Sequence, residues 1–199
     1  MTFDEAWVCT DRIEGWLHRE EGAALWRGCE AAVPVDGSMV EIGAYRGRST
    51  SLLAQFAAGR ASLTVVEPFW YAPGVRDGDV PNQNRYLDRV YQDETYRTFA
   101  VNMKEFFYTV VLEPTIDLLP TDLPASIDFA FIDGDHTLAG VLVDCFTVLP
   151  RVRVGGIVAF HDYRPDVYDV KRVVDWCCRP SEWVLVEQAM ELRVLRRIS

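Results

Sequence analysis

Two short segments carry the side chains best suited to chemistry. Residues 131–137, which read FIDGDHT, place two carboxylates and an imidazole within one turn, and His161-Asp162 follows another apolar run. Carboxylates and imidazoles transfer protons, and histidine has the ordinary pKa closest to neutrality. We therefore expect a site of acid–base chemistry with Asp135, His136 and His161 as candidate general bases.

Polar groups also end other predicted strands. The full set is Glu41, Glu67, Asp133 and the pair His161-Asp162. The carboxyl ends of parallel strands lie at one edge of a sheet, where open α/β folds bind their ligands. We therefore expect one crevice lined by these groups. The plainer alternative is that each is a loop-entry residue or a helix cap.

A strand, a glycine turn and a helix follow one another in residues 40–50, which read VEIGAYRGRST. Gly43 can adopt backbone angles that a side chain would forbid. Gly47 lets the incoming helix, or a ligand, approach the end of the strand. Ser49 and Thr50 are expected to accept hydrogen bonds from free N–H groups at the start of the helix.

The spacing of the turn argues against a phosphate ligand. Tyr45 stands where a dinucleotide-binding G-x-G-x-x-G turn has its second glycine, and no G-K-[ST] follows. The remaining pattern, E-x-G-x-x-x-G, resembles motif I of the class I S-adenosylmethionine (SAM)-dependent methyltransferases. An acid beside the turn suits the sulfonium cation of SAM. The implied cofactor-binding residues here are Glu41, Gly43, Ala44, Tyr45, Gly47 and Ser49.

The second strand supplies the next cofactor prediction. Glu67 follows Gly43 by roughly 25 residues, near the interval at which nucleotide-binding folds place an acid on the ribose hydroxyls. Phe69 or Trp70 would then flank the adenine, with ordinary core packing as the alternative for these aromatic rings. Pro68, between Glu67 and Phe69, is included among the expected cofactor-binding residues. Thr115 occupies the segment that often contacts adenine in this fold, although the G-D-S usual in the family is not present there.

Residues 131–137 resemble the F-I-D-G-D-H segment of methyltransferase family 24, which includes macrocin-type and sugar O-methyltransferases. The segments that carry this resemblance are 14–17, 40–50, 127–137 and 149–163. The resemblance implies SAM as the cofactor, Asp133 among the residues that bind it, and a hydroxyl of a sugar or natural-product scaffold as the methyl acceptor.

The resemblance also implies roles for the acids. In metal-dependent members the first acid of D-G-D, here Asp133, is a magnesium ligand and the second, here Asp135, is the general base. His161 and Asp162 stand where such members have further ligands, but His161 replaces an aspartate. Magnesium prefers oxygen ligands, whereas imidazole suits later transition metals. The sequence thus leaves open magnesium, another divalent metal, or none.

Composition narrows the partners. The chain has 199 residues, 49% of them hydrophobic, a formal net charge of −10 and a pI of about 4.8. This charge disfavours nucleic acids and anionic membranes, and no apolar run is long enough to span a bilayer. Five cysteines without C-x-x-C spacing favour a reducing cytoplasmic setting. We expect a small-molecule acceptor, and a homo-oligomer remains open.

Strand-like and helix-like segments alternate along the chain, and a turn at Val154-Gly155-Gly156 is predicted before a strand over residues 157–160. This alternation predicts one domain over residues 1–199, a Rossmann-like three-layer α/β sandwich. Its seven-stranded sheet is expected to be mostly parallel, with an antiparallel C-terminal hairpin. Helix is predicted throughout residues 3–32, within an N-terminal helical cap over residues 1–35. The aromatic loop 69–93 is expected to be a lid.

Other functions remain open. A SAM-binding fold can host chemistry other than methyl transfer. A metal-dependent hydrolase or lyase would use Asp133, His136, His161 and Asp162, but would not need the glycine turn or the acid after the second strand. A non-catalytic binding protein is disfavoured by the full row of edge acids, and a nicotinamide oxidoreductase by Tyr45.

Overall fold

A seven-stranded sheet forms the centre of the molecule in the computed structural model, which describes residues 1–69, 94–165 and 169–199. The strand order is β3-β2-β1-β4-β5-β7-β6. β7 runs antiparallel to both of its neighbours, while the other pairings are parallel. The strands are β1 Gly37–Ile42, β2 Ala61–Val66, β3 Thr109–Val111, β4 Ile127–Ile132, β5 Val152–Phe160, β6 Trp183–Ala189 and β7 Leu192–Arg197.

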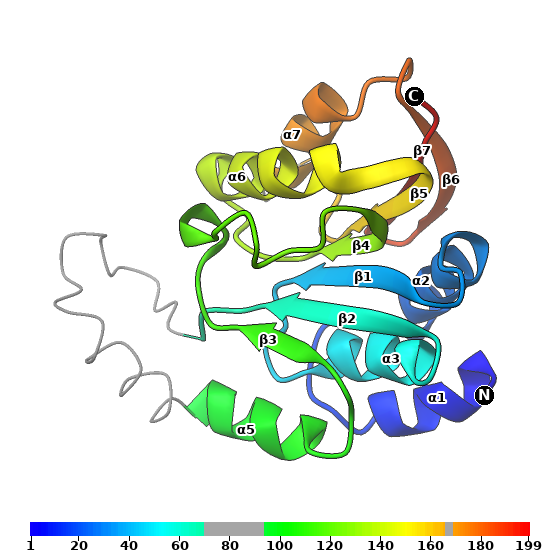
Figure 1. Ribbon diagram of the computed structural model, residues 1–199, viewed down its shortest axis with the longest axis vertical. Coiled ribbons are helices and arrows are strands. Elements are labelled where there is room, and N and C mark those ends of the chain that lie inside the picture. The colour runs from blue at the N-terminus through cyan, green and yellow to red at the C-terminus, as the bar shows by residue number, and fades with distance from the viewer. Residues whose placement is uncertain (70–93, 166–168) are drawn as a thin grey trace, which may run out of the picture.

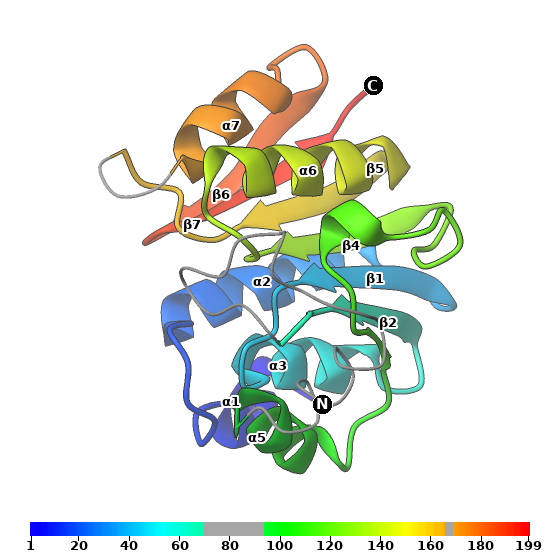
Figure 2. The ribbon, with the colours of Figure 1, turned by 90° about the vertical axis from the view of Figure 1, so that its left-hand side faces the viewer.

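Helices cover both faces of this sheet, as the sequence predicts for a three-layer sandwich. α1, α2, α3 and α5 lie on one side, and α6 and α7 lie on the other (Figures 1 and 2). The helices are α1 Phe3–Thr10, α2 Arg19–Ala32, α3 Arg48–Ala57, α5 Glu94–Met103, α6 Leu138–Val148 and α7 Val170–Cys177, with 3-10 turns η1 Thr115–Asp117 and η2 Leu149–Arg151.

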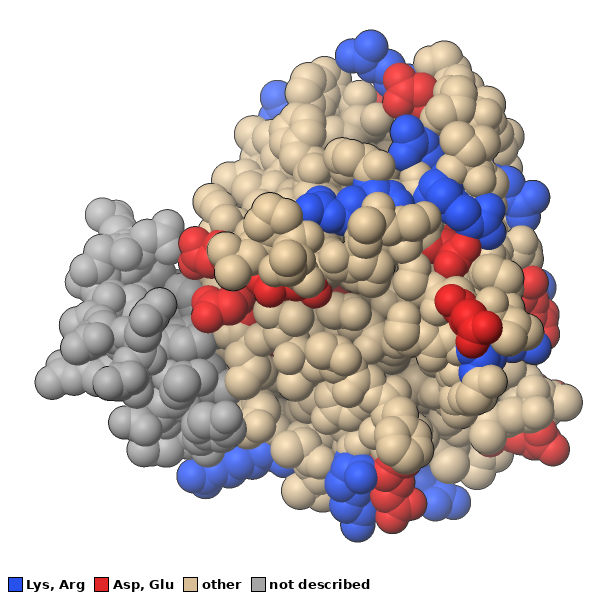
Figure 3. Space-filling model, in the orientation of Figure 1, with Lys and Arg blue, Asp and Glu red and all other residues tan. Residues whose placement is uncertain are grey.

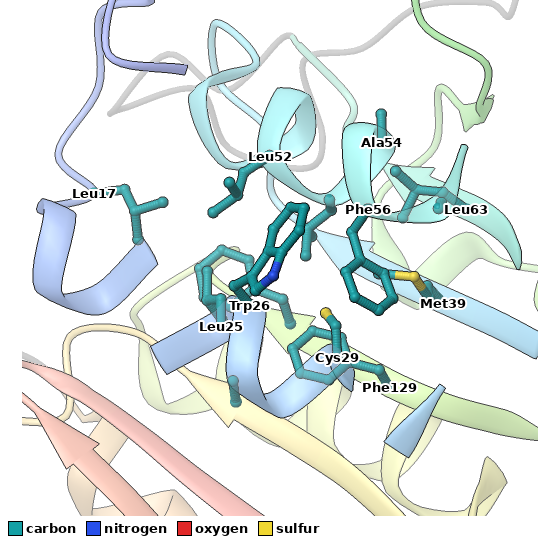
Figure 4. Close-up of a cluster of buried hydrophobic side chains, with 14 of the residues drawn as sticks. Leu17, Leu25, Trp26, Cys29, Met39, Leu52, Ala54, Phe56, Leu63 and Phe129 are labelled. Atoms are coloured by element: carbon teal, nitrogen blue, oxygen red, sulfur yellow. The ribbon is translucent and has the colours of Figure 1, made fainter. Parts of the chain in front are cut away.

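Two hydrophobic cores hold the layers together. In the first, α2 and α3 pack on the sheet, and the Trp26 indole meets the Phe56 ring edge-on at 5.1 Å (Figure 4). In the second, α6 and α7 cover the opposite face, against residues such as Ile132 and Phe160. The central strands are apolar on both sides because both sides are buried. The sheet is therefore a firm support for the residues that follow the strand ends.

The register places the strand ends at one level. Ile42 pairs with Ile132, and Ile132 pairs with Phe160. The arrowheads of β1, β2 and β4 accordingly point to the same side of the molecule (Figure 1). The residues that follow these strands meet at a single edge, as the parallel-sheet argument predicts.

The predicted continuous helix over residues 3–32 is wrong. Two helices form instead, and residues 11–18 between them are not α-helical. The Arg48 guanidinium stabilises this connection, since it donates to the carbonyls of Asp11, Ile13 and Leu17 at 3.2, 2.7 and 2.9 Å. Contacts with a distant residue thus override the helical apolar pattern.

Two further expectations meet the structure differently. β5 starts at Val152, so the predicted turn at Val154-Gly155-Gly156 is part of the strand. Gly155, at φ +85°, marks an irregularity there, and the pairing of β4 with β5 shifts register near Ile127. Within the expected lid, residues 70–93 lie outside the described residues. Of the described helices, none is long and apolar enough to cross a membrane.

Candidate active site

The glycine turn between β1 and α3 is shaped by two close approaches. Gly43 has φ +85°, and a Cβ there would lie 2.0 Å from the carbonyl oxygen of Asp133. The glycine therefore allows the ends of β1 and β4 to touch. Gly47 has φ +92° and is the N-cap of α3, and a Cβ there would lie 3.0 Å from Met103 of α5. Among the described residues, the close neighbour of Gly47 is thus another helix.

The predicted capping role of Ser49 and Thr50 is wrong. Gly47 is the N-cap of α3, and no side chain caps this helix. The Ser49 hydroxyl instead donates to Oε1 of Glu41 at 2.5 Å. Glu41 is completely buried at the end of β1, where a carboxyl without a donor would be costly. Burial raises the pKa of Glu41 to about 8, so this carboxyl is mostly protonated at neutral pH.

Glu67 binds the backbone of the same turn. Its Oε2 accepts the N–H groups of Ala44 at 2.8 Å and Tyr45 at 3.1 Å, and its Oε1 accepts that of Phe69 at 2.8 Å. Burial raises the pKa of this carboxyl. Glu67 thus shapes the turn, and a ribose would share carboxylate oxygens already bonded to the backbone. Ribose binding by Glu67 stays a prediction.

Three non-glycine residues at this edge have left-handed backbone conformations. Tyr45, Phe69 and Asp162 have φ of +48°, +56° and +53°. Such conformations cost free energy in residues with a side chain and are concentrated at ligand-binding and catalytic sites. Their occurrence after β1, β2 and β5 supports this edge as the functional site.

Two histidines bridge the same two carboxylate oxygens. Nε2 of His136 lies 3.3 Å from Oδ1 of Asp133 and 2.9 Å from Oδ2 of Asp162. Nδ1 of His161 lies 3.4 Å from each of those oxygens. The backbone also joins the two strand ends, since the His161 N–H donates to the Ile132 carbonyl. The structure thus brings these four side chains together at the edge where the sequence places them.

The cluster sets the protonation of its members. Burial alone would lower the pKa of both histidines, but hydrogen bonds to Asp133 and Asp162 outweigh it. They raise the pKa of His136 to about 9 and the pKa of His161 to about 12. Burial would likewise raise the pKa of the two aspartates, but the histidines hold it below its usual range. At neutral pH both imidazoles are protonated and both carboxylates are ionised.

His161 has a further partner that sequence reasoning missed. Its Nε2 lies 3.2 Å from Oε2 of Glu21, a carboxylate of α2, and the two side chains are 6% and 1% exposed. The residues are 140 positions apart. The available signal was an acid within a helix that carries an apolar face. His18 is exposed and is the N-cap of α2.

The potential metal ligands differ from the expected set. Ligand atoms of Asp133, His136 and Asp162 lie within 4.8 Å of one another. The expected set had His161 in place of His136. The His161 ring instead lies between Glu21 and the two aspartates, with both nitrogens engaged. Two carboxylates and one imidazole suit a transition metal better than Mg²⁺.

Asp135 lies in the loop before α6. Its Oδ1 accepts the backbone N–H of Thr137 and its Oδ2 accepts the Thr137 hydroxyl, both at 2.9 Å. Thr137 in turn caps α6 by accepting from the Gly140 N–H. Asp135 is therefore fixed by its own loop.

Two expected cofactor contacts lie in different settings. The Phe69 ring is 4% exposed and packs against Tyr96 and Phe99 of α5, with centroids 5.3 and 4.9 Å away. This packing favours the core alternative over an adenine contact for Phe69. Thr115 begins η1, which follows β3 and contacts α6. Its contact with adenine stays a prediction.

Two further residues lie near the site. Asp144 of α6 is 3% exposed, burial raises its pKa to about 7, and a Cβ on Gly134 would lie 2.9 Å from its Oδ2. The acid inside an apolar helix was the available signal. Trp16 is 71% exposed and its ring lies 4.9 Å from that of Tyr45, which brings the α1–α2 connection to the glycine turn. Figure 3 shows acidic side chains at the left of the visible face, the side to which the strands point, and others at its right edge.

A comparison with known families decides the assignment. A family model described as a methyltransferase domain, Methyltransf_24, matches residues 40–163, more than half of the chain. The chain belongs to this methyltransferase family. The match spans the glycine turn, Glu67 and the Asp/His cluster, whereas Glu21 lies outside it.

Individual relatives are more distant from this methyltransferase. The uncharacterized protein R132 of Acanthamoeba polyphaga mimivirus is 29% identical over 129 residues, which cover 65% of this chain and 52% of that protein. The methyltransferase thus spans about half the length of this curated relative.

Solved structures show the same fold. The O-methyltransferase NovP is 17% identical with a TM-score of 0.65, over 91% of this chain and 81% of that one. CalS11, a TDP-rhamnose 3'-O-methyltransferase of calicheamicin biosynthesis, is 14% identical with a TM-score of 0.57, over 88% and 77%. At these identities the likeness supports the fold alone.

Proposed function

We propose that this methyltransferase transfers the methyl group of SAM to a hydroxyl of a small molecule. The observation that carries the proposal is the meeting of the glycine turn with the cluster of Asp133, His136, His161 and Asp162 at one level of the sheet edge. An adjoining turn and acid–base cluster provide what the reaction requires, a place for the cofactor beside groups that orient an acceptor.

Asp135 is the base that we propose for this reaction. The acceptor oxygen attacks the methyl carbon, the carbon–sulfur bond breaks, S-adenosylhomocysteine leaves, and the hydroxyl proton passes to Asp135. His136 and His161 are protonated at neutral pH, because their pKa values are raised to about 9 and about 12. They are therefore suited to donate hydrogen bonds. The carboxylate oxygens of Asp135, in contrast, accept the hydrogen bonds described above from the backbone N–H and the hydroxyl of Thr137.

A small polar acceptor fits the charge of the chain. The net charge of −10 repels nucleic acids, and an acidic edge favours a neutral or cationic acceptor. Two enzymes of similar fold, NovP and CalS11, are O-methyltransferases, and the second acts on TDP-rhamnose. We therefore propose a sugar or natural-product scaffold as the acceptor class. The five free cysteines suit an enzyme of the reducing cytoplasm.

A divalent metal is a second element of the proposal. Asp133, His136 and Asp162 would hold it, because their ligand atoms already lie within 4.8 Å of one another. A bound metal lowers the pKa of a coordinated hydroxyl and would assist its deprotonation. The donor set favours manganese or a later transition metal over magnesium.

Calorimetric titration of the chelator-treated protein with SAM and with S-adenosylhomocysteine tests the proposal. We expect both ligands to bind, and a panel of sugars and natural-product alcohols to yield S-adenosylhomocysteine with at least one acceptor. Asp135→Asn is expected to retain SAM binding and to lose about 100-fold or more in methyl transfer. Asp4→Asn, at an exposed acid of α1, is the matched control. Failure of both ligands to bind would refute the proposed function.

A further inference from the structure

The N-terminal helix α2 contributes a buried acid to the Asp/His cluster. Glu21 is 1% exposed, and its Oε2 lies 3.2 Å from Nε2 of His161. On the other side of the same ring, Nδ1 lies 3.4 Å from Oδ1 of Asp133 and 3.4 Å from Oδ2 of Asp162. The His161 ring is therefore held between three carboxylates from three different parts of the chain.

Glu21 itself is held rigidly. Its Oε2 also accepts the backbone N–H of His18 at 3.0 Å, within the first turn of α2. Its Oε1 accepts the backbone N–H of Glu191 at 3.1 Å, in the turn between β6 and β7. Both carboxylate oxygens thus have backbone donors, so the position of Glu21 is set by α2 and the β6–β7 turn together.

The geometry fixes the hydrogens of the imidazole. Both ring nitrogens of His161 face carboxylate oxygens, which are acceptors when ionised. A ring nitrogen without a hydrogen would repel the oxygen that it faces. Both nitrogens therefore donate, and the pairing of Nε2 with Glu21 fits the ring orientation that points Nδ1 at Asp133 and Asp162.

We propose that Glu21 is a positioning residue of the active site, which binds Nε2 of His161 and thereby directs Nδ1 at the carboxylate oxygens of Asp133 and Asp162. The inference rests on the proposed function, because it concerns the same site. It assigns a role to α2, which lies outside the part of the chain matched by the family.

Burial energetics argue that this arrangement is more than packing. A buried carboxylate and imidazole lose their hydration, and apolar side chains of similar volume would fill the space without this cost. The pair adjoins the oxygens of Asp133 and Asp162, two potential metal ligands, and outer partners of metal ligands commonly change metal affinity or activity by about 10- to 100-fold when they are removed. Glu21 is therefore expected to act on the reaction through His161.

Nitrogen NMR of the full-length protein tests the proposal directly. In protein with ¹⁵N-labelled histidine, with His161→Asn used for assignment, both His161 nitrogens of the wild type should show the shifts of protonated sites at pH 7. Glu21→Ala should shift the Nε2 and Nδ1 resonances or broaden them by exchange. Glu21→Gln keeps an acceptor oxygen for Nε2 and should give an intermediate spectrum.

Glu20 offers a matched control on the same helical turn. It is exposed, so Glu20→Ala and Glu20→Gln should leave the His161 resonances unchanged. Unchanged His161 shifts in folded Glu21→Ala, or equal shifts in Glu20→Ala, would overturn the proposal. If Glu21→Ala does not fold, Glu21→Gln decides, and a wild-type His161 spectrum together with wild-type kcat in this variant would overturn it.

Kinetics separate this proposal from the proposed function. Once an acceptor is known, Glu21→Gln should lower kcat about 10-fold while the KM for SAM changes less than about threefold. An equal loss in kcat for Glu20→Gln would contradict the assignment. If wild-type protein binds neither SAM nor S-adenosylhomocysteine, the proposed function fails, yet the NMR comparison still decides whether Glu21 orients His161.

Discussion

Nε2 of His136 donates to Oδ2 of Asp162 across 2.9 Å and joins the loop after β4 to the end of β5. The same nitrogen is 3.3 Å from Oδ1 of Asp133. The protonated imidazole of His136 therefore attracts the carboxylates of Asp133 and Asp162, and the strength of this attraction depends on the proton of His136. This dependence gives the cluster a measurable response to pH.

Stability should fall as His136 loses its proton. Its pKa rises from an ordinary 6.5 to about 9, because hydrogen bonds to Asp133 and Asp162 outweigh the opposing effect of burial. The contribution to the free energy of unfolding is then full below pH 6.5 and is lost as the pH rises through about 9. Since the side chain is about a third exposed, we expect a loss of about 1 kcal/mol. Urea unfolding at pH 6 and pH 9.5 should show a loss that is smaller by about 1 kcal/mol in His136→Gln than in wild type and in His18→Gln, while the pH dependence that comes from buried Glu41 remains in all three. Equal pH dependence in wild type and His136→Gln would contradict it.

Metal binding should compete with the same proton. If Asp133, His136 and Asp162 hold a divalent ion, His136 must be deprotonated before it can coordinate the ion. Affinity for Mn²⁺ should therefore rise about 10-fold between pH 7 and pH 8, because both values lie below the pKa of about 9. Calorimetry of chelator-treated protein measures this. His136→Asn should abolish the pH dependence, and His18→Asn should retain it. An affinity that is independent of pH would exclude His136 as a ligand.

The mostly parallel sheet and the convergence of polar groups followed from the sequence because both depend on local patterns. Apolar runs that end in an acid predict buried parallel strands, and parallel strands bring their ends to one edge. Asp133, His136, His161 and Asp162 could thus be placed together before their contacts were known. Which atoms of these side chains meet depends on side-chain torsions, which no sequence pattern specifies.

The misses share a physical cause. The break between α1 and α2 is stabilised by the guanidinium of Arg48, and the partner of His161 is Glu21, which lies 140 positions away. Ser49 donates to Glu41 instead of capping α3, because a buried carboxyl without a hydrogen-bond donor would be costly. Contacts of this kind arise only when the layers pack. They are therefore invisible to periodicity and to capping preferences.

Glu41→Gln should stabilise the fold and weaken SAM binding. Between pH 4.5 and 8 the folded chain keeps a proton on Glu41 that the unfolded chain releases, so the free energy of unfolding falls as pH rises. Glutamine removes this loss and still offers an oxygen to Ser49. We expect Glu41→Gln to gain about 2 kcal/mol in the free energy of unfolding at pH 8, measured by urea unfolding, and to gain nothing below pH 4.5.

The same variant tests the contact with the cofactor. If Glu41 ionises beside the sulfonium of bound SAM, Glu41→Gln should lower SAM affinity about 10-fold. Affinity for S-adenosylhomocysteine, whose sulfur is uncharged, should fall less. Glu20→Gln, at an exposed site, should change neither quantity.

Two glycines with similar backbone angles should respond differently to alanine. Gly43 has φ +85° and its added Cβ would lie 2.0 Å from the Asp133 carbonyl oxygen, whereas Gly59 has φ +67° and no atom within 4 Å of its added Cβ. Gly59→Ala should therefore cost only the strain of a left-handed alanine, about 1 kcal/mol. Gly43→Ala should cost about 3 kcal/mol or more, because the ends of β1 and β4 must separate. It should also abolish SAM binding measured by calorimetry, while Gly59→Ala binds normally. Equal destabilisation of the two variants would show that the contact between the strand ends relaxes freely, and the turn would then not depend on it.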